Sequence, residues 1–428
     1  MREADWLDID AALRIMLDAV EPHGTETTTL DDAHGRTLAL PVVSPIDQPP
    51  WDNSAMDGFA VVSGDVHGAT EDSPVILRVI EDIPAGARPQ HALKRGEASR
   101  IMTGAPVPVG ADGVIRIEHT QPGDEGHIAI IRDADAGRNI RLRGEDIRAG
   151  ETVLERGRLL RAGEVGVLAM VGCTEPVVYR RPRVALLATG DELVEPERIE
   201  DVIAATHIIN SNTPALAAGL RATDCVPVPL GIARDDLDDL RTRLEGARDA
   251  DALITTAGAS VGDHDVVKQA LEDLGCATLF WRVRIRPGSP FSFGLLRRTD
   301  GRAIPVFGLP GNPVSALVTF EILVRPVLRK MLGRTRLYPV VERVNTGEDV
   351  RSPAGLVRFL RVTLRDSGDG TRRAYLTGPQ GSGILTSVAA ADALLIVPLD
   401  VDHVPEDTVV RIVRLRAGDD AQEHFDLS

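Results

Sequence analysis

Two adjacent carboxylates follow a run of apolar residues near the middle of the chain. The stretch is LLATGDEL, residues 186–193, in which Thr189 and Gly190 are followed directly by Asp191 and Glu192. Carboxylates at the end of a strand suit Mg²⁺, which binds one or two of them together with phosphate oxygens of a substrate. The same pair also suits the start of a helix, with Asp191 as N-cap and Glu192 in the first turn. The stretch alone leaves both interpretations open.

Further acidic residues follow two other apolar runs. Asp235 and Asp236 come after one of them, and Asp263 and Asp265 lie in AGASVGDHD, residues 257–265. A turn of small residues is common between a strand and a helix, so by itself it is a weak sign of a ligand site. Three strand ends that deliver acids to one edge of a sheet nevertheless predict a metal that bridges phosphate groups.

Arginines gather in a segment that contains no acidic residue. In FWRVRIRPGSPFSFGLLRR, residues 280–298, Arg282, Arg284 and Arg286 alternate with apolar residues. On a strand this alternation places the three guanidinium groups on one face, where they could bind an oxyanion. The alternative is a solvated strand face that is paired with acids elsewhere.

The loop GLPGNPVSA, residues 308–316, also has the features of an anion site. Asn312 is a residue type that favours the N-cap, and Pro313 fits the first turn of a helix. Backbone N–H groups at a helix start favour an anion, and Ser315 could add a hydroxyl donor. We therefore expect this loop and the arginine segment to serve the same oxyanion.

Three more stretches hold polar residues, but the spacing of these residues alone does not indicate a particular reaction. NIRLRGEDI, residues 139–147, contains Arg141 and Arg143, which predict either a phosphate site or a salt-bridged corner between domains. Asp57 lies in PPWDNSAMDGFAV, and Thr103 lies in a turn of RIMTGAPVPVG. The sequence has no zinc-ligand spacing, no nucleophile elbow and no P-loop lysine motif.

The pattern of apolar residues divides the chain into regions of different structure. Residues 8–23 predict an amphipathic helix, and the Gly- and Pro-rich region 25–178 predicts β-rich units with a helix over 158–170. From 180 to 332 strands and helices alternate, which predicts a parallel sheet with helices on both faces and a ligand site at the carboxyl ends of its strands. Pro326 is expected to kink or end the last helix there. The remaining C-terminal region predicts a small all-β domain.

Composition limits the classes of function. The 428 residues have a formal charge of −16, which argues against nonspecific binding to nucleic acid or to an anionic membrane surface. Cys173, Cys225 and Cys276 are widely spaced in apolar surroundings and predict core thiols rather than a disulfide framework. No apolar run approaches the length of a membrane span and no secretory signal is recognised, so a cytoplasmic location is expected.

Six of these stretches together resemble the molybdopterin molybdenumtransferase family, whose members insert molybdenum into molybdopterin. They occur in that family's order along the chain as DNSAMDGFAV, RIMTGAPVP, NIRLRGEDI, TGDEL, GASVGDHD and GLPGNPVSALVTF. The resemblance implies a multidomain α/β plus β fold with four parts. These are a doubly wound molybdopterin-binding domain from 1–24 and 180–333, a linking domain from 25–43 and 148–179, a β-rich domain from 44–147, and a C-terminal β-barrel-like domain from 338–428.

The resemblance also implies a homodimer that acts on adenylylated molybdopterin and molybdate with Mg²⁺ and releases AMP. In this dimer the β-rich domain of one chain reaches the doubly wound domain of the other. The implied catalytic residues are Asp57, Thr103, Asp191, Glu192 and Asp265, and the last three with Asp236 are the implied metal ligands. The implied molybdate ligands are Arg286, Ser315, Ser382 and either Arg358 or Arg361. Further implied cofactor-binding residues are Thr189, Gly190, Gly258, Ser260, Arg141, Arg143 and Arg282.

The sequence departs from the family pattern at the arginine segment. The family usually has KPGKP where this chain has RPGSP, so Arg286 keeps a charge and Ser289 loses one. Ala257 replaces a usual glycine, and Asn210 stands where an acidic residue is usual. Two other functions therefore stay open: a noncatalytic molybdopterin-binding scaffold, and a metal-dependent nucleotide hydrolase that needs only residues 180–333. The intact acidic pairs favour catalysis over the scaffold.

Overall fold

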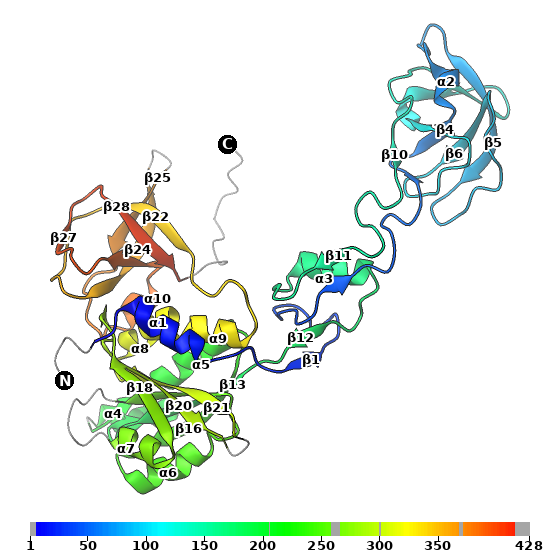
Figure 1. The fold of residues 1–428 in the computed structure, drawn as a ribbon. Coiled ribbons are helices and arrows are strands. Elements are labelled where there is room, and N and C mark those ends of the chain that lie inside the picture. Colours follow the sequence, from blue (N-terminus) through cyan, green and yellow to red (C-terminus); the bar gives the residue numbers. More distant parts are fainter. Residues whose placement is uncertain (1–5, 205, 258–265, 299–300, 368–370, 416–428) are drawn as a thin grey trace.

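The computed structural model describes residues 6–204, 206–257, 266–298, 301–367 and 371–415. Figure 1 shows a compact body at one end, a separate β-rich unit at the other end, and a narrow connection between them. The N-terminal helix lies on the body, and the chain then builds the distant unit before it returns. The body therefore combines the N-terminal helix with the second half of the chain.

The central sheet of the body has six strands in the order β16-β13-β17-β21-β20-β18. The first four pair in parallel, as predicted, whereas β20 and β18 add an antiparallel edge. A sheet of this kind binds its ligand at the carboxyl ends of the parallel strands. The bounds are β13 (Arg183–Thr189), β16 (Val226–Ala233), β17 (Ala252–Ala257), β18 (Cys276–Arg282), β20 (Pro290–Arg297) and β21 (Ala303–Pro310).

Helices cover both faces of this sheet, which confirms the predicted doubly wound arrangement. Val184 and Leu186 of β13 pack in one apolar cluster with residues of α5, whereas Ala185 and Leu187 pack in another with residues of α6 and α7. Successive side chains of a strand point to opposite faces, so one apolar strand serves both cores. The helices are α5 (Asn212–Ala222), α6 (Leu237–Glu245) and α7 (Val266–Asp273).

The prolines of β16 do not interrupt it. The sequence predicts a strand broken by prolines, yet Pro227 and Pro229 lie inside one continuous strand. β16 is an edge strand of the sheet, and a proline nitrogen that faces the unpaired side of an edge strand removes no ladder hydrogen bond.

The N-terminal helix is shorter than its apolar pattern. The sequence predicts a helix over 8–23, but α1 ends earlier, at Asp18 (Ile9–Asp18). Val20 still joins the cluster that contains Met16, so the apolar pattern continues past the last helical turn. α1 packs against α9 (Arg325–Met331) on the α5 side of the sheet.

The helix after β21 contains a π-helical turn. α8 (Pro313–Thr319) passes into the π turn η4 (Phe320–Val324) and then into α9. Of the two effects predicted for Pro326, an end of the helix is wrong, because Pro326 lies in the first turn of α9, which runs on to Met331. A local distortion of the helix is present as the π turn directly before it. The wide turn before Pro326 accommodates a residue that has no N–H to donate.

The narrow connection consists of two short strand pairs and one helix. β1 pairs with β12, and β2 pairs with β11. The predicted helix over 158–170 begins later, after Arg161, whose N–H donates to the Glu164 carboxylate at 3.1 Å. The elements are β1 (Thr25–Thr27), β2 (Val42–Val43), β11 (Thr152–Leu154), α3 (Ala162–Met170) and β12 (Val177–Tyr179).

The distant unit is a six-stranded sheet in the order β7-β4-β6-β5-β9-β8, with a separate pair of β3 and β10 beside it. Its strands are β3 (Asn53–Ser54), β4 (Gly58–Val61), β5 (Val75–Ile83), β6 (Glu97–Ile101), β7 (Gly113–Arg116), β8 (Thr120–Pro122), β9 (His127–Ile130) and β10 (Ile140–Arg141). The short helices α2 (Ser63–Val66) and η2 (Ile117–His119) complete it. β-rich structure was predicted for this region.

The C-terminal region forms a closed five-stranded barrel in the order β24-β25-β22-β28-β26, with β26 pairing back to β24. β19 (Ile285–Arg286), from the arginine segment, pairs in parallel with β24 and joins the barrel to the body. The other elements are β22 (Val341–Thr346), β23 (Val350–Arg351), β24 (Val357–Ser367), β25 (Thr371–Leu376), α10 (Thr386–Ala389), β26 (Ala393–Val397), β27 (His403–Val404) and β28 (Val409–Arg414).

Two findings complete the description. Cys225 and Cys276 are buried free thiols, which agrees with the prediction of core thiols, whereas Cys173 is a free thiol that is only half-buried. Among the described residues, no helix has the length and apolar character needed to cross a membrane.

Candidate functional site

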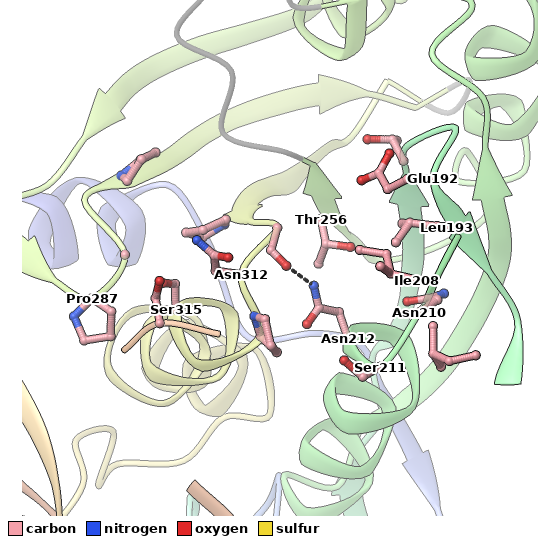
Figure 2. A pocket seen from close by; sticks show the side chains of 18 of the residues that line it. Glu192, Leu193, Ile208, Asn210, Ser211, Asn212, Thr256, Pro287, Asn312 and Ser315 are labelled. Atoms are coloured by element: carbon pink, nitrogen blue, oxygen red, sulfur yellow. Dashed lines mark hydrogen bonds between the residues drawn. The ribbon is translucent and has the colours of Figure 1, made fainter. Parts of the chain in front are cut away.

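A pocket of about 480 Å³ opens at the carboxyl ends of the parallel strands. Its wall combines the ends of β13 and β17, the loop before α8, the segment around Arg286, and a loop of the barrel. Figure 2 shows Glu192 at one end of this pocket, Pro287 and Ser315 at the other, and Thr256 between them. The pocket therefore lies at the edge of the sheet where the sequence predicted a ligand site.

The end of β13 supplies Thr189 and Glu192 to the pocket. Gly190 between them has φ +145°, and a Cβ built on it would meet the Glu192 carboxylate at 2.6 Å. Only glycine therefore lets this carboxylate lie against the turn. The alternative in which Asp191 caps a helix is wrong, because the chain continues into the strand β14 (Leu193–Val194).

The first two acidic strand ends meet as predicted. The backbone N–H of Asp235 donates to the Asp191 carboxylate at 3.2 Å, next to the paired ends of β13 and β16. Asp236 has a structural role: its carboxylate caps α6 by accepting from the N–H of Asp239 at 3.2 Å. Asp191 and Glu192 thus remain the acids of this strand end whose carboxylates are not committed to a helix cap.

The third group of acidic residues follows β17. Gly258, Ser260, Asp263 and Asp265 lie outside the described residues. Within the part of the chain that is described, no group of three or more His, Cys, Asp or Glu side chains could hold a metal ion. The predicted four-residue metal set therefore stays a prediction.

The loop before α8 has the predicted N-cap residue and the predicted proline start. Asn312 occupies the N-cap position without a side-chain capping bond, and Pro313 begins the helix. The N–H of Val314 donates to the carbonyl of Ser382 at 3.1 Å, which ties the barrel loop to the helix start. Ser315 is 4% exposed and lines the pocket together with Ser382. The prediction that Ser315 and Ser382 share one site agrees with this geometry.

Three neutral residues of the pocket were not singled out for binding from the sequence. Asn212 donates from Nδ2 to the carbonyl of Gly311 at 2.7 Å, a bond drawn in Figure 2. Asn210 holds the start of α5 by accepting from the N–H of Thr213 at 3.2 Å. Thr256, the last residue but one of β17, lies beside them. Polar residues directly after short apolar runs, as in HIINSNT and LITTAG, were the available signal.

The three arginines of the arginine segment do not act together. The guanidinium of Arg282 lies over the Trp6 ring at 5.2 Å, and Arg284 pairs with Asp8 at 3.3 Å. Only Arg286 lines the pocket. The prediction of one shared face is wrong because β18 ends at Arg282 and the chain then crosses to the barrel, where β19 begins. Arg282 is therefore not placed as a cofactor-binding residue.

The two candidate arginines of β24 have different surroundings. Arg361 is fully buried; its Nε donates to the Ser387 hydroxyl and its Nη2 to the Gly381 carbonyl, both at 3.0 Å. Burial lowers the pKa of this guanidinium. Arg358 is half-buried and is the register partner of Arg286. Arg361 thus supports the loop that carries Ser382, whereas Arg358 lies beside a pocket residue.

Asp57 and Thr103 lie together in the distant unit. The Asp57 carboxylate accepts from both the N–H and the hydroxyl of Thr103, each at 2.7 Å. The bond from the Thr103 N–H is the main cause that lowers the pKa of Asp57. Figure 1 places this unit far from the pocket of the same chain. A single chain therefore does not bring these two residues to Glu192.

Arg141 and Arg143 also belong to the far end of the molecule. Arg141 lies in the short strand β10. Arg143 pairs with Asp47 at 2.5 Å, and its N–H donates to Asp52 at 2.7 Å. For Arg143 these bonds form a salt-bridged corner, the alternative to a phosphate site, but both acids belong to the same predicted domain, 44–147, and not to a neighbouring one.

The pocket has a charge gradient along its length. Glu192, with Asp191 close by, makes one end acidic, whereas Arg286 and two serine hydroxyls make the other end suitable for an oxyanion. Neutral amide and hydroxyl groups lie between the ends. A ligand that carries phosphate groups at one end and meets an oxyanion at the other matches this distribution.

Three family models match consecutive parts of the chain. They are described as MoeA N-terminal region (domain I and II), over residues 7–172; Probable molybdopterin binding domain, over 185–330; and MoeA C-terminal region (domain IV), over 343–415. Together they cover the distant unit, the pocket domain and the barrel.

Curated relatives and solved structures match over nearly the whole chain. The molybdopterin molybdenumtransferase of Nostoc sp. is 36% identical over 395 residues, which is 91% of this chain and 89% of the relative. Molybdopterin molybdenumtransferase 2 of Mycobacterium tuberculosis is 38% identical over 392 residues, 90% of this chain and 94% of the relative. The crystal structure of a molybdopterin biosynthesis moeA protein from Pyrococcus horikoshii OT3 has a TM-score of 0.81 and 30% identity, covering 96% of this chain and 100% of that one.

Proposed function

Because the chain belongs to the molybdopterin molybdenumtransferase family, we propose that it joins molybdate to adenylylated molybdopterin and releases AMP. The observation that carries the proposal is the pocket with an acidic end and an oxyanion end. A pyrophosphate link suits the acidic end if a divalent cation neutralises it. Molybdate suits the end with Arg286, Ser315 and Ser382.

The residues at the two ends have different roles in this reaction. Arg286 holds molybdate by charge, and the hydroxyls of Ser315 and Ser382 donate to its oxygens. Thr189 and Thr256 at the strand ends orient the phosphate groups. Positioning both reactants in one pocket removes much of the entropic cost of their encounter.

Mg²⁺ fits the acidic end in part. It prefers hard oxygen ligands and often uses only one or two carboxylates, with substrate phosphates and water as its other ligands. Asp191 and Glu192 supply such a pair at the end of β13, and Asp265 stays a proposed third ligand. When bound, Mg²⁺ supplies positive charge for the phosphate oxygens. This charge also lets acidic residues and an anionic substrate coexist.

We further propose a homodimer that completes the site. Asp57 and Thr103 are bonded to each other at the end of the molecule that is distant from the pocket. The length of the connection would allow the distant unit of one protomer to reach the pocket of a second. A two-fold dimer would then build two equal sites, each from both chains. The expected cytoplasmic location stays a prediction.

The two alternative functions find no support in the comparisons. A hydrolase that needs only the pocket domain leaves the matches over 7–172 and 343–415 unexplained. The curated relatives carry the name of a transferase and not that of a scaffold.

The function is tested by following AMP release from adenylylated molybdopterin in the presence of Mg²⁺. AMP release that requires molybdate is the expected result. Release that ignores molybdate would support hydrolysis, and no release would support the scaffold. Glu192→Gln should slow the reaction strongly, whereas Glu197→Gln is the matched control because Glu197 is exposed and does not line the pocket.

A further inference from the structure

Arginines gather on one outer face of the C-terminal barrel, whose strands β22, β24, β25 and β28 are labelled in Figure 1. Arg343 of β22 is the register partner of Arg411 of β28. Arg365 of β24 is the register partner of Arg373 of β25, and β25 in turn pairs with β22, where Asn345 lies opposite Arg373. A neighbour of each arginine along its strand packs in or against the barrel core, so the four arginines point outward. We call these four residues the arginine face.

The arginine face is electrostatically unfavourable for the barrel itself. Register partners in an antiparallel pair have Cβ atoms about 4.5–5.5 Å apart, and like charges placed there destabilise the pairing. Arg343, Arg365 and Arg411 are exposed, and none of them takes part in an ion pair among the described residues. Arg373 differs, because it pairs with Asp407 at 3.1 Å. Within the described part of the chain, the face thus keeps uncompensated cations on a protein of formal charge −16.

Apolar side chains lie among these cations. Val341 and Val409 are two positions before Arg343 and Arg411 along their strands, and therefore lie on the same face. They are 49% and 61% exposed. Covering the two valines with a partner would remove apolar surface from water, which favours association.

A tyrosine ring is fixed at another part of the same face. The guanidinium of Arg365 lies over the Tyr375 ring, 4.6 Å from its centre. On its other side the ring lies against Gly347, where a Cβ would meet it at 2.1 Å. Arginine and tyrosine are residue types enriched at protein interfaces. A ring that is already held in place loses little conformational freedom when a partner binds.

We propose that the arginine face binds an acidic segment of a partner protein. Carboxylates of that segment remove the repulsion between the paired arginines, and its apolar residues cover the two valines. The rest of the acidic chain repels such a partner, so the attraction is confined to this face and steers the encounter there. None of the four arginines lines the pocket, and the inference therefore does not depend on the proposed reaction.

A nucleic acid fits the arginine face less well. Nonspecific binding to a phosphate backbone needs many cationic contacts along an extended basic surface. Here a few cations lie among exposed valines on a chain that is acidic as a whole. A short run of protein carboxylates matches this distribution better.

The test measures by fluorescence anisotropy the binding of a labelled peptide made of glutamates with interspersed leucines. The wild type should bind it, with an affinity that falls as salt is added. Combining Arg343→Gln with Arg411→Gln should weaken binding about tenfold, since two exposed ion pairs are lost. The control combines Arg132→Gln with Arg138→Gln, two exposed arginines of the distant unit. It removes the same charge and should bind like the wild type.

Thermal unfolding separates a role in binding from a role in stability. The variant with Arg343→Gln and Arg411→Gln should melt at the wild-type temperature or above it, because a repulsive cross-strand pair has been removed. A lower melting temperature would assign the two arginines a structural role and would overturn the inference.

The binding data can overturn the inference in three ways. The peptide could fail to bind the wild type, or could bind the wild type and the Arg343→Gln, Arg411→Gln variant equally well. A short DNA duplex could instead bind more tightly than the peptide and lose its affinity in the same variant, in which case the face would serve a nucleic acid. Each of these results leaves the proposed function untouched, because that function is measured separately as molybdate-dependent release of AMP.

Discussion

Replacing Arg361 by methionine should separate activity from stability. Arg361 has no exposed surface, and its side-chain bonds in the described residues go to a hydroxyl and a carbonyl and not to a carboxylate. Its two side-chain bonds reach Ser387 and the carbonyl of Gly381. The loop that begins at Gly381 presents Ser382 to the pocket. The chain thus keeps an uncompensated buried cation beneath a loop of the site.

The expected change in stability is small because two large terms oppose each other. Hydrogen bonds to a charged group contribute about 1.5–3 kcal/mol each, so losing two costs about 3–6 kcal/mol. Burying an ion without a counter-ion costs several kcal/mol, and methionine removes that cost. The free energy of unfolding of Arg361→Met should therefore stay within about 2 kcal/mol of the wild type.

Activity should fall much further. Without the bond to Gly381 the loop is free to shift, and a displacement of about 1 Å at a reacting group can reduce the rate about 100-fold. Arg361→Lys should also lose most activity, since an ammonium cannot reach both oxygens as the fork does. It should unfold more easily than the methionine variant, because lysine keeps the buried charge and loses the fork.

The assay measures AMP release and urea unfolding for both variants, with Arg351→Gln as the control for a change on the barrel surface. We expect both variants to lose activity, and we expect Arg361→Lys to lose more stability than Arg361→Met. A methionine variant with at least half of the wild-type rate would refute the reasoning. The reasoning would also be refuted if the loss of activity in the two variants were proportional to their loss of stability.

Three more predictions follow from the same structure. Removing divalent metal with a chelator should stop molybdate-dependent AMP release and Mg²⁺ should restore it; an unaffected rate would show that the carboxylates at the end of β13 do not act through a metal. Mixing inactive Asp57→Asn and Glu192→Gln chains should recover about a quarter of the wild-type rate, because half of the randomly mixed dimers contain one intact site of two; no recovery after verified subunit exchange would contradict the shared site. Iodoacetamide at about pH 8 should label Cys173 but not Cys225 or Cys276 in the native protein, because burial raises the pKa of Cys225 to about 12 and that of Cys276 to about 11; equal labelling of all three thiols before unfolding would contradict their burial.

Local patterns determined the secondary structure and the location of the site. The apolar run of β13 and the glycine turn after it predicted a buried strand that ends at a ligand site, and the pocket lies there. Such features depend on neighbouring residues only, because strand periodicity and glycine conformations are local properties. For the same reason the sequence could not fix where α1 ends or how the chain accommodates Pro326.

Only the tertiary structure decided which charges act together. The alternation of Arg282, Arg284 and Arg286 predicted one cationic face, yet the chain changes from one sheet to another between them. Two of these arginines meet Trp6 and Asp8 from the N-terminus. The register partner of Arg286 is instead Arg358, 72 positions further along the chain. Charge pairing depends on distances in space, which no spacing in the sequence encodes.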